Sequence, residues 1–163
     1  MYICKIASLE EISRKWDYEI EKHKGDNAWV VWKKDFVNGV KNKKRICYYG
    51  ILDDCIISEG TAILSKDQVQ NSDGLVGETT AYLCAFRTVE EHQGKGYFSK
   101  LYKFMENDLK NRGYKMLTLG VEPCEEKNKK IYSSYGFTTF VKSAYEEYPQ
   151  NKKIQVDYYC KIL

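Results

Sequence analysis

The sequence has no long apolar run and little proline, and these two features argue against a membrane-spanning protein and against a disordered chain. No hydrophobic stretch approaches the roughly 20 residues of a membrane-spanning helix, so we expect no transmembrane segment. Two prolines and eleven glycines in 163 residues are too few for a disordered or linker-rich chain. The hydrophobic fraction of 43% suffices for a core, and the length predicts one domain over residues 1–163.

Metal-binding motifs are also absent. The six cysteines include no Cys-x-x-Cys pair, and the two histidines, His23 and His92, lie far apart in the sequence. We therefore expect no metal site. No secretory leader is recognisable, so we expect reduced cysteines and a cytoplasmic location.

The charge balance is nearly even. The net charge of +3 is weak for a nucleic-acid-binding protein, so we expect no nucleic-acid partner. Basic residues do cluster between positions 33 and 45, either as the solvated face and end of a helix or as a patch for an acidic partner. The cluster consists of Lys33, Lys34, Lys41, Lys43, Lys44 and Arg45.

The spacing of apolar residues predicts an α/β chain. It favours strands at residues 2–7, 46–52, 56–64, 81–88, 115–122, 137–145 and 154–163. Steps of three and four predict helices after Ser8, after Asp26, over residues 97–111 and over residues 125–135. The polar segment from Lys66 to Gly77 predicts a loop. This order predicts a mixed sheet with helices on its faces, in which residues 81–122 form a right-handed parallel crossover.

A glycine-rich turn, Gln93-Gly94-Lys95-Gly96-Tyr97-Phe98-Ser99, lies between the strand at 81–88 and the helix at 97–111. The first N–H groups of a helix have no intrahelical partner, and the helix dipole adds positive charge there. Glycines let the backbone approach an anion closely, and Lys95 adds a full charge. The turn therefore predicts a site for the phosphates of a nucleotide-like cofactor. ATP and NAD are disfavoured, because Gly-Lys is not followed by Ser or Thr and no Gly-x-Gly-x-x-Gly occurs.

These residues resemble the GNAT superfamily of N-acetyltransferases, whose phosphate motif is Gln/Arg-x-x-Gly-x-Gly/Ala. The motif here runs from Gln93 to Phe98, and Phe98 departs from the small residue of the family pattern. A second mark is a helix that carries a Tyr shortly before a Gly-Phe pair, here Tyr132 before Gly136-Phe137. The order of predicted elements also fits, so the resemblance covers nearly the whole chain.

The resemblance implies the acyl-CoA N-acyltransferase fold, with a mostly antiparallel sheet and one splayed parallel pair. It implies acetyl-CoA as co-substrate, with pantetheine in the gap between the strands at 81–88 and 115–122. Asn128, four residues before Tyr132, could bond the pantetheine amides, although the family more often has Asn where Glu125 stands. The cofactor-binding residues so implied are Phe86, Thr88, Gln93, Gly94, Lys95, Gly96, Tyr97, Phe98, Ser99 and Asn128.

The resemblance also implies catalytic roles. Tyr132 occupies the position of the acid that protonates the departing CoA sulfur, with Tyr135 as an alternative. A family base often lies on the strand before the glycine turn, where the equivalent position is Thr80. Glu78 shares the face of Thr80 if that strand extends to it, and Glu122 is the competing candidate. Direct attack by the amine is favoured over an acetyl-cysteine route through Cys84 or Cys124, for which His92 is the one nearby base.

Two functions remain open from the sequence. The first is an N-acetyltransferase that acts on a small primary amine or a protein amino group. The second is a regulatory or sensor module that binds acyl-CoA without turnover. The first two helices, which carry Trp16, Trp29 and Trp32, lie on the acceptor side in this family but contain no motif that identifies the acceptor. The protein could be a monomer or a homodimer, with no membrane partner.

Overall fold

The structure is a computed structural model that describes all 163 residues. The chain forms two compact units. Unit 1 contains residues Met1–Ala62 and Ala85–Met105, and unit 2 contains Ile63–Cys84 and Glu106–Leu163. No helix is both long enough and apolar enough to cross a membrane.

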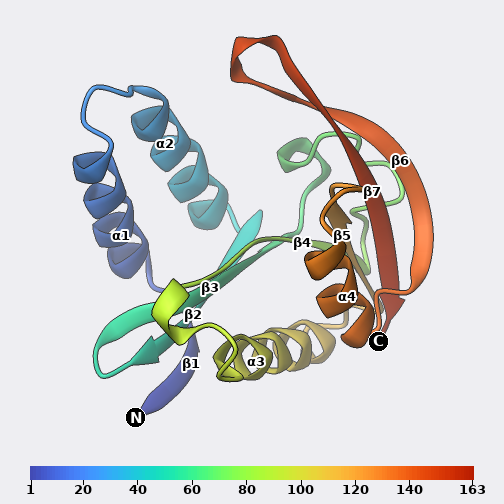
Figure 1. Ribbon diagram of the computed structural model, residues 1–163, viewed down its shortest axis with the longest axis horizontal. Coiled ribbons are helices and arrows are strands. Elements are labelled where there is room, and N and C mark those ends of the chain that lie inside the picture. The colour runs from blue at the N-terminus through green and yellow to red at the C-terminus, as the bar shows by residue number, and fades with distance from the viewer. The chain divides into compact units, whose positions relative to one another are not determined.

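The chain contains four α-helices and seven strands. Figure 1 labels them in chain order. The helices are α1 (Leu9–Lys22), α2 (Ala28–Lys41), α3 (Tyr97–Asn111) and α4 (Glu126–Ser134). The strands are β1 (Tyr2–Ile6), β2 (Arg45–Leu52), β3 (Cys55–Ile63), β4 (Thr80–Thr88), β5 (Met116–Val121), β6 (Thr139–Tyr148) and β7 (Lys152–Ile162).

The strands are hydrogen-bonded in the order β1-β2-β3-β4-β5-β7-β6. β4 and β5 are parallel, whereas β1 with β2, β5 with β7 and β6 with β7 are antiparallel. The predicted mixed α/β sheet is therefore confirmed. The parallel ladder joins Thr80–Leu83 to Met116–Leu119, which is only the first part of β4. The splay beyond it stays a prediction.

In unit 1, α1 and α2 lie side by side and pack their apolar residues against β2 and β3 (Figure 1). The core there is formed by Ala7, Ile12, Cys47 and Tyr49, with Trp16, Phe36, Val37, Val40, Ile51 and Ile56 packed around it. The turn between β2 and β3 consists of Asp53 and Asp54, which both have positive φ (48° and 65°). Such a two-residue turn matches the twist of paired strands and fixes their register.

α1 begins with an N-cap at Ser8, the residue after which the sequence predicts a helix. The Ser8 side chain accepts a hydrogen bond from the Glu11 N–H (3.2 Å), and the Glu11 carboxylate accepts one from the Ser8 N–H (2.8 Å). This reciprocal pair satisfies two N–H groups that the helix cannot satisfy itself. It fixes where α1 starts and hence which α1 residues face the sheet.

Replacing Ser8 with Ala is expected to lower the free energy of unfolding by about 1 kcal/mol, because the Glu11 N–H loses its acceptor. Urea unfolding followed by circular dichroism measures this loss. Ser13→Ala, in the interior of the same helix, is the matched control and should be neutral or slightly stabilising. Equal losses in the two variants would contradict a capping role for Ser8.

Unit 2 has its own core, formed by Ile63, Leu75, Val76, Tyr82, Val156 and Tyr158. The segment from Lys66 to Gly77 connects β3 to β4 with only a short 3-10 turn at Lys66–Gln68, as the predicted loop requires, but its end is not on the surface, since Leu75 and Val76 are buried there. The buried Thr118 hydroxyl donates to the Leu75 carbonyl oxygen (2.7 Å), which holds this segment on β5. A lone apolar pair in a polar segment has no periodicity, so only the tertiary structure identifies it as core.

Candidate functional site

The glycine-rich turn lies in unit 1, between the end of β4 and the start of α3. Gly94 and Gly96 have positive φ (71° and 79°), and a Cβ on either would meet no atom within 4 Å. The Gln93 side chain donates to the Thr88 carbonyl oxygen (3.0 Å), so it ties the turn back to β4. The Lys100 N–H bonds the Gly96 carbonyl oxygen (3.2 Å) as the helix starts. The turn is an open, positively polarised backbone surface that fits an anion such as a diphosphate.

A tyrosine from β1, which sequence reasoning missed, holds the start of α3. The Tyr2 hydroxyl donates to the Tyr97 carbonyl oxygen (2.9 Å) and lies 2.7 Å from Ser58 Oγ. Because Tyr2 has one proton to donate, Ser58 is the donor in the second bond. Burial raises the pKa of Tyr2 to about 12, so the hydroxyl remains a donor at neutral pH. A Cβ on Gly50 would lie 2.0 Å from the Tyr2 hydroxyl oxygen, so this packing needs glycine there.

Tyr2→Phe is expected to weaken CoA binding by roughly 2- to 12-fold, because the lost hydrogen bond loosens the turn at Tyr97. Calorimetric titration with CoA measures the change. The exposed Tyr18→Phe on α1 is the matched control and should bind CoA as wild type does. If Tyr2→Phe lost stability but bound CoA unchanged, Tyr2 would have a structural role alone.

Phe98, where the family motif has a small residue, contacts β4. Its ring lies edge-on to that of Phe86, with 5.0 Å between the ring centroids. Phe86 also packs close to Gly60, where an added Cβ would lie 3.2 Å from the Phe86 ring. The departure from the motif therefore adds an aromatic contact between the first turn of α3 and the β4 segment of unit 1.

Unit 2 contains the predicted site residues Glu122, Asn128 and Tyr132, which all interact with Glu125. The Glu125 carboxylate accepts hydrogen bonds from the Glu122 N–H (3.1 Å) and the Asn128 side-chain amide (3.0 Å). Asn128 and Tyr132 are four residues apart on α4 and so share a face. Burial raises the pKa of Tyr132 above its usual value, and the negative charge of Glu125 adds to this. Tyr132 is therefore a protonated phenol at neutral pH.

Glu78 does not occupy the position that its proposed role needs. β4 begins at Thr80, so Glu78 lies in the preceding turn and is exposed. Gly77 and Thr80 close this turn by exchanging backbone hydrogen bonds of 3.0 and 3.3 Å. The strand does not extend to Glu78, because this turn ends it first, so the condition under which Glu78 would share the face of Thr80 is not met. Glu122 directly follows β5 and is partly buried.

The cysteines and histidines form no cluster. None of the six cysteines forms a disulfide, and in unit 2 Cys84 is partly buried and Cys124 is exposed. His92 belongs to unit 1, where its ring lies edge-on to Tyr97 and its Nδ1 is buried without a hydrogen-bond partner. No three His, Cys, Asp or Glu residues are grouped as a metal site would require.

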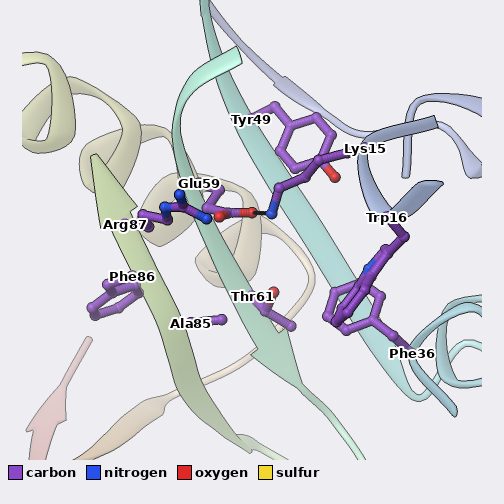
Figure 2. Close-up of a pocket in the computed structure, with 9 residues that line it drawn as sticks. All are labelled: Lys15, Trp16, Phe36, Tyr49, Glu59, Thr61, Ala85, Phe86 and Arg87. Atoms are coloured by element: carbon purple, nitrogen blue, oxygen red, sulfur yellow. Dashed lines mark hydrogen bonds and ion pairs between the residues drawn. The ribbon is translucent and has the colours of Figure 1, made fainter. Parts of the chain in front are cut away.

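Unit 1 also contains a pocket that the sequence did not predict, drawn in Figure 2. Its volume is about 330 Å³. Ala85 has a positive φ of 54°, which breaks the alternation of side chains along β4. Three consecutive β4 residues therefore line the pocket. The lining residues are Lys15, Trp16, Phe36, Tyr49, Glu59, Thr61, Ala85, Phe86 and Arg87.

Two ion pairs connect α1 to the strands at this pocket. Lys15 pairs with Glu59 of β3, and these side chains are 20% and 13% exposed. Glu19 pairs with Arg87 of β4 (3.2 Å), and these are 10% and 56% exposed. Lys15 and Glu19 are four residues apart, so both point from one face of α1. Sequence reasoning missed all four charges because they come from three separate segments.

Comparison with solved structures finds the same fold at low sequence identity. A ribosomal-protein-alanine N-acetyltransferase from Brucella melitensis has 10% identity and a TM-score of 0.70, with 99% of each chain covered. IAA acetyltransferase from Bacillus cereus has 13% identity and a TM-score of 0.67, with 100% of each chain covered. An N-acetyltransferase from Staphylococcus aureus has 13% identity and a TM-score of 0.68, with 99% of this chain and 98% of that chain covered.

These likenesses show the fold, and the sequence itself shows the family. No curated protein sequence matches this chain. Residues 6–137 match the acetyltransferase (GNAT) family, and this range is well over half of the 163 residues. It includes the glycine-rich turn, α3, β5 and α4. The chain therefore belongs to the acetyltransferase (GNAT) family.

Proposed function

We propose that the protein transfers an acetyl group from acetyl-CoA to a primary amine by direct attack. The observation that carries this proposal is the turn between β4 and α3, with positive φ at Gly94 and Gly96 and open space beside both. Membership of the acetyltransferase (GNAT) family supports the reaction class.

The turn and β4 would bind the co-substrate through the backbone. The N–H groups of residues 93–99 would receive the diphosphate, and Lys95 would add a counter-charge. Backbone groups around Phe86 and Thr88 would pair with the pantetheine amides. Asn128, whose amide already donates to Glu125, keeps its carbonyl oxygen as an acceptor for such an amide.

The reaction requires two proton transfers. The acceptor arrives as an ammonium ion and must lose one proton before its nitrogen can attack. The nitrogen then bonds to the thioester carbonyl carbon, the C–S bond breaks, and a second proton from the nitrogen leaves. The net products are an N-acetyl amide, CoA thiol and one proton released to solvent.

Tyr132 would protonate the CoA sulfur as it leaves. A phenol suits this role because its reference pKa of ~10 lies near the ~8.5 of a thiol. The burial that raises the Tyr132 pKa keeps the phenol protonated and ready to donate. Glu122 is the better placed of the two base candidates, since it directly follows β5, and water could carry the proton to it.

The test measures binding and turnover separately. Calorimetry with CoA should show one site per chain, and thiol release from acetyl-CoA should depend on an added amine. Mass spectrometry of the acceptor should show the mass of one acetyl group added. Tight CoA binding without thiol release, across small amines and peptides with free N-termini, would replace this proposal with the acyl-CoA sensor. Absence of CoA binding would refute both functions.

A further inference from the structure

The unit 1 pocket borders the β4 segment that leads to the glycine-rich turn, since Phe86 and Arg87 line it. We propose that this pocket takes the acceptor, and that the acceptor is a free α-amino acid with an apolar side chain. This inference rests on the proposed acetyl transfer and specifies its acceptor. Glu59 would bind the ammonium group and Arg87 the carboxylate.

The size and walls of the pocket indicate a small ligand with an apolar body. A volume of about 330 Å³ is near the lower end of small-molecule sites, which range over roughly 300–1,000 Å³. Trp16, Phe36 and Phe86 supply aromatic surface from α1, α2 and β4. Burial raises the pKa of Tyr49, so its ring adds an uncharged wall. Such walls favour an apolar side chain over a polar polyamine.

Glu59 and Arg87 each have hydrogen-bonding atoms that their ion pairs with α1 leave unused. One carboxylate oxygen of Glu59, Oε2, bonds Lys15, while Oε1 has no hydrogen-bond partner. The one buried side-chain polar atom without a hydrogen-bond partner is His92 Nδ1. Glu59 Oε1 has no partner and is not that atom, so it is accessible to solvent. Arg87 donates through one nitrogen to Glu19 and is 56% exposed, so other guanidinium N–H groups remain available.

The pocket therefore offers one anionic acceptor and one cationic donor from neighbouring strands (Figure 2). Glu59 and Arg87 pair with α1 and not with each other. With Lys15 and Glu19 included, the four charges sum to zero, so a ligand with one charge of each sign balances them best. An amino acid carries an ammonium and a carboxylate on one carbon. An amine without a carboxylate, or an acid without an amine, would use only half of the site.

The group transfer is the same as that described above. The bound ammonium loses one proton to solvent, its nitrogen forms the amide bond, and the second proton ends on the CoA sulfur or in solvent. Glu59 contacts the substrate in this assignment, and its role is to bind and orient the ammonium. Arg87 determines specificity, because only a ligand with a carboxylate engages it.

Four ligands test the assignment on the wild-type protein without turnover. The ligands are phenylalanine, 2-phenylethylamine, 3-phenylpropionate and lysine. The first three share a phenyl ring, and phenylalanine and lysine share the α-ammonium and carboxylate groups. Each is titrated calorimetrically in saturating CoA, which carries no acetyl group to transfer. Phenylalanine should bind at least about tenfold more tightly than 2-phenylethylamine, 3-phenylpropionate or lysine, since each lost charged hydrogen bond costs about 10-fold or more. Equal binding of phenylethylamine and phenylalanine, or tighter binding of lysine, would overturn the proposal.

Paired variants assign the two charges. Arg87→Gln should weaken the binding of phenylalanine about tenfold and change the binding of 2-phenylethylamine by less than about twofold. Glu59→Gln should weaken the binding of both compounds by about tenfold. The matched controls are Arg14→Gln and Glu21→Gln, which remove exposed charges from α1, the helix with which Glu59 and Arg87 form ion pairs. If Glu59→Gln does not fold, Phe36→Ala tests the apolar wall and should weaken phenylalanine without changing the Kd of CoA.

Failure of this assignment is distinguishable from failure of the acetyl transfer. If CoA thiol is released with peptides or polyamines and no amino acid binds, the acceptor assignment is wrong and the proposed function remains. If phenylalanine binds with the expected selectivity and no amine gives thiol release, the pocket assignment remains and the proposed function is wrong.

Discussion

Replacing Tyr132 with Phe is expected to lower kcat by about 100- to 10,000-fold, because the leaving thiolate loses its acid. The Km for acetyl-CoA should change less than about threefold, since the ring stays in place. Thiol release at saturating acetyl-CoA and amine measures kcat. Tyr135→Phe is the matched variant from the end of α4. A large loss in Tyr135→Phe with little change in Tyr132→Phe would transfer the role to Tyr135.

The same assignment predicts the alkaline side of the pH profile. An acid must be protonated to act, and the pKa of Tyr132 is raised above its usual value of 10.0. Between pH 7 and pH 9.5 the phenol thus remains protonated, so kcat should not fall through loss of this proton. A decline of wild-type kcat with a midpoint below pH 9, absent from Tyr132→Phe, would contradict the assignment.

Replacing Gly96 with Val is expected to weaken CoA binding by about 100-fold or more. A β-branched residue at the φ of +79° is strained, so the backbone should leave this conformation and re-aim the N–H groups of the turn. Each charge-assisted hydrogen bond lost to the diphosphate should cost about 10-fold or more. Calorimetry with CoA measures the loss directly.

Gly113→Val provides the matched control for this prediction. Gly113 ends the same helix, has a φ of +92°, and has no atom within 4 Å of a Cβ position. Both variants should lose about 1–2 kcal/mol of unfolding free energy through backbone strain, and only Gly96→Val should lose CoA affinity. Similar CoA affinities in the two variants would refute phosphate binding by the turn.

The sequence predicted those elements whose signals are local. The helix at residues 97–111 has the predicted bounds, because its apolar spacing, the glycine before it and Gly113 after it act within the segment itself. The helix after Ser8 was predicted for the same reason, since its apolar residues recur at helical spacing within the segment. The phosphate-type turn was also predictable, because glycine spacing determines its backbone.

The parts that were missed depend on distant segments. Tyr2 on β1 contacts Tyr97 at the start of α3, and no pattern around Tyr2 points to that partner. Ala85 adopts a positive φ without being Gly, Asn or Asp, the residues that would have signalled it. Glu59 and Arg87 read as ordinary strand charges until the structure places both at one pocket. Whether the strand reaches Glu78 could not be decided from the sequence, because its start is determined by the turn at Gly77–Thr80.

The hydrogen bond between Tyr2 and Tyr97 has a consequence for biosynthesis, because 95 positions separate its two residues. At a translation rate of roughly 5–20 residues per second, Tyr2 exists for about 5 to 20 seconds before its partner is made. During that interval β1 can already pair with β2, whose last residue is Leu52. A nascent chain that stalls before Tyr97 would thus contain the β1–β2 ladder and lack the contact between Tyr2 and the glycine-rich turn.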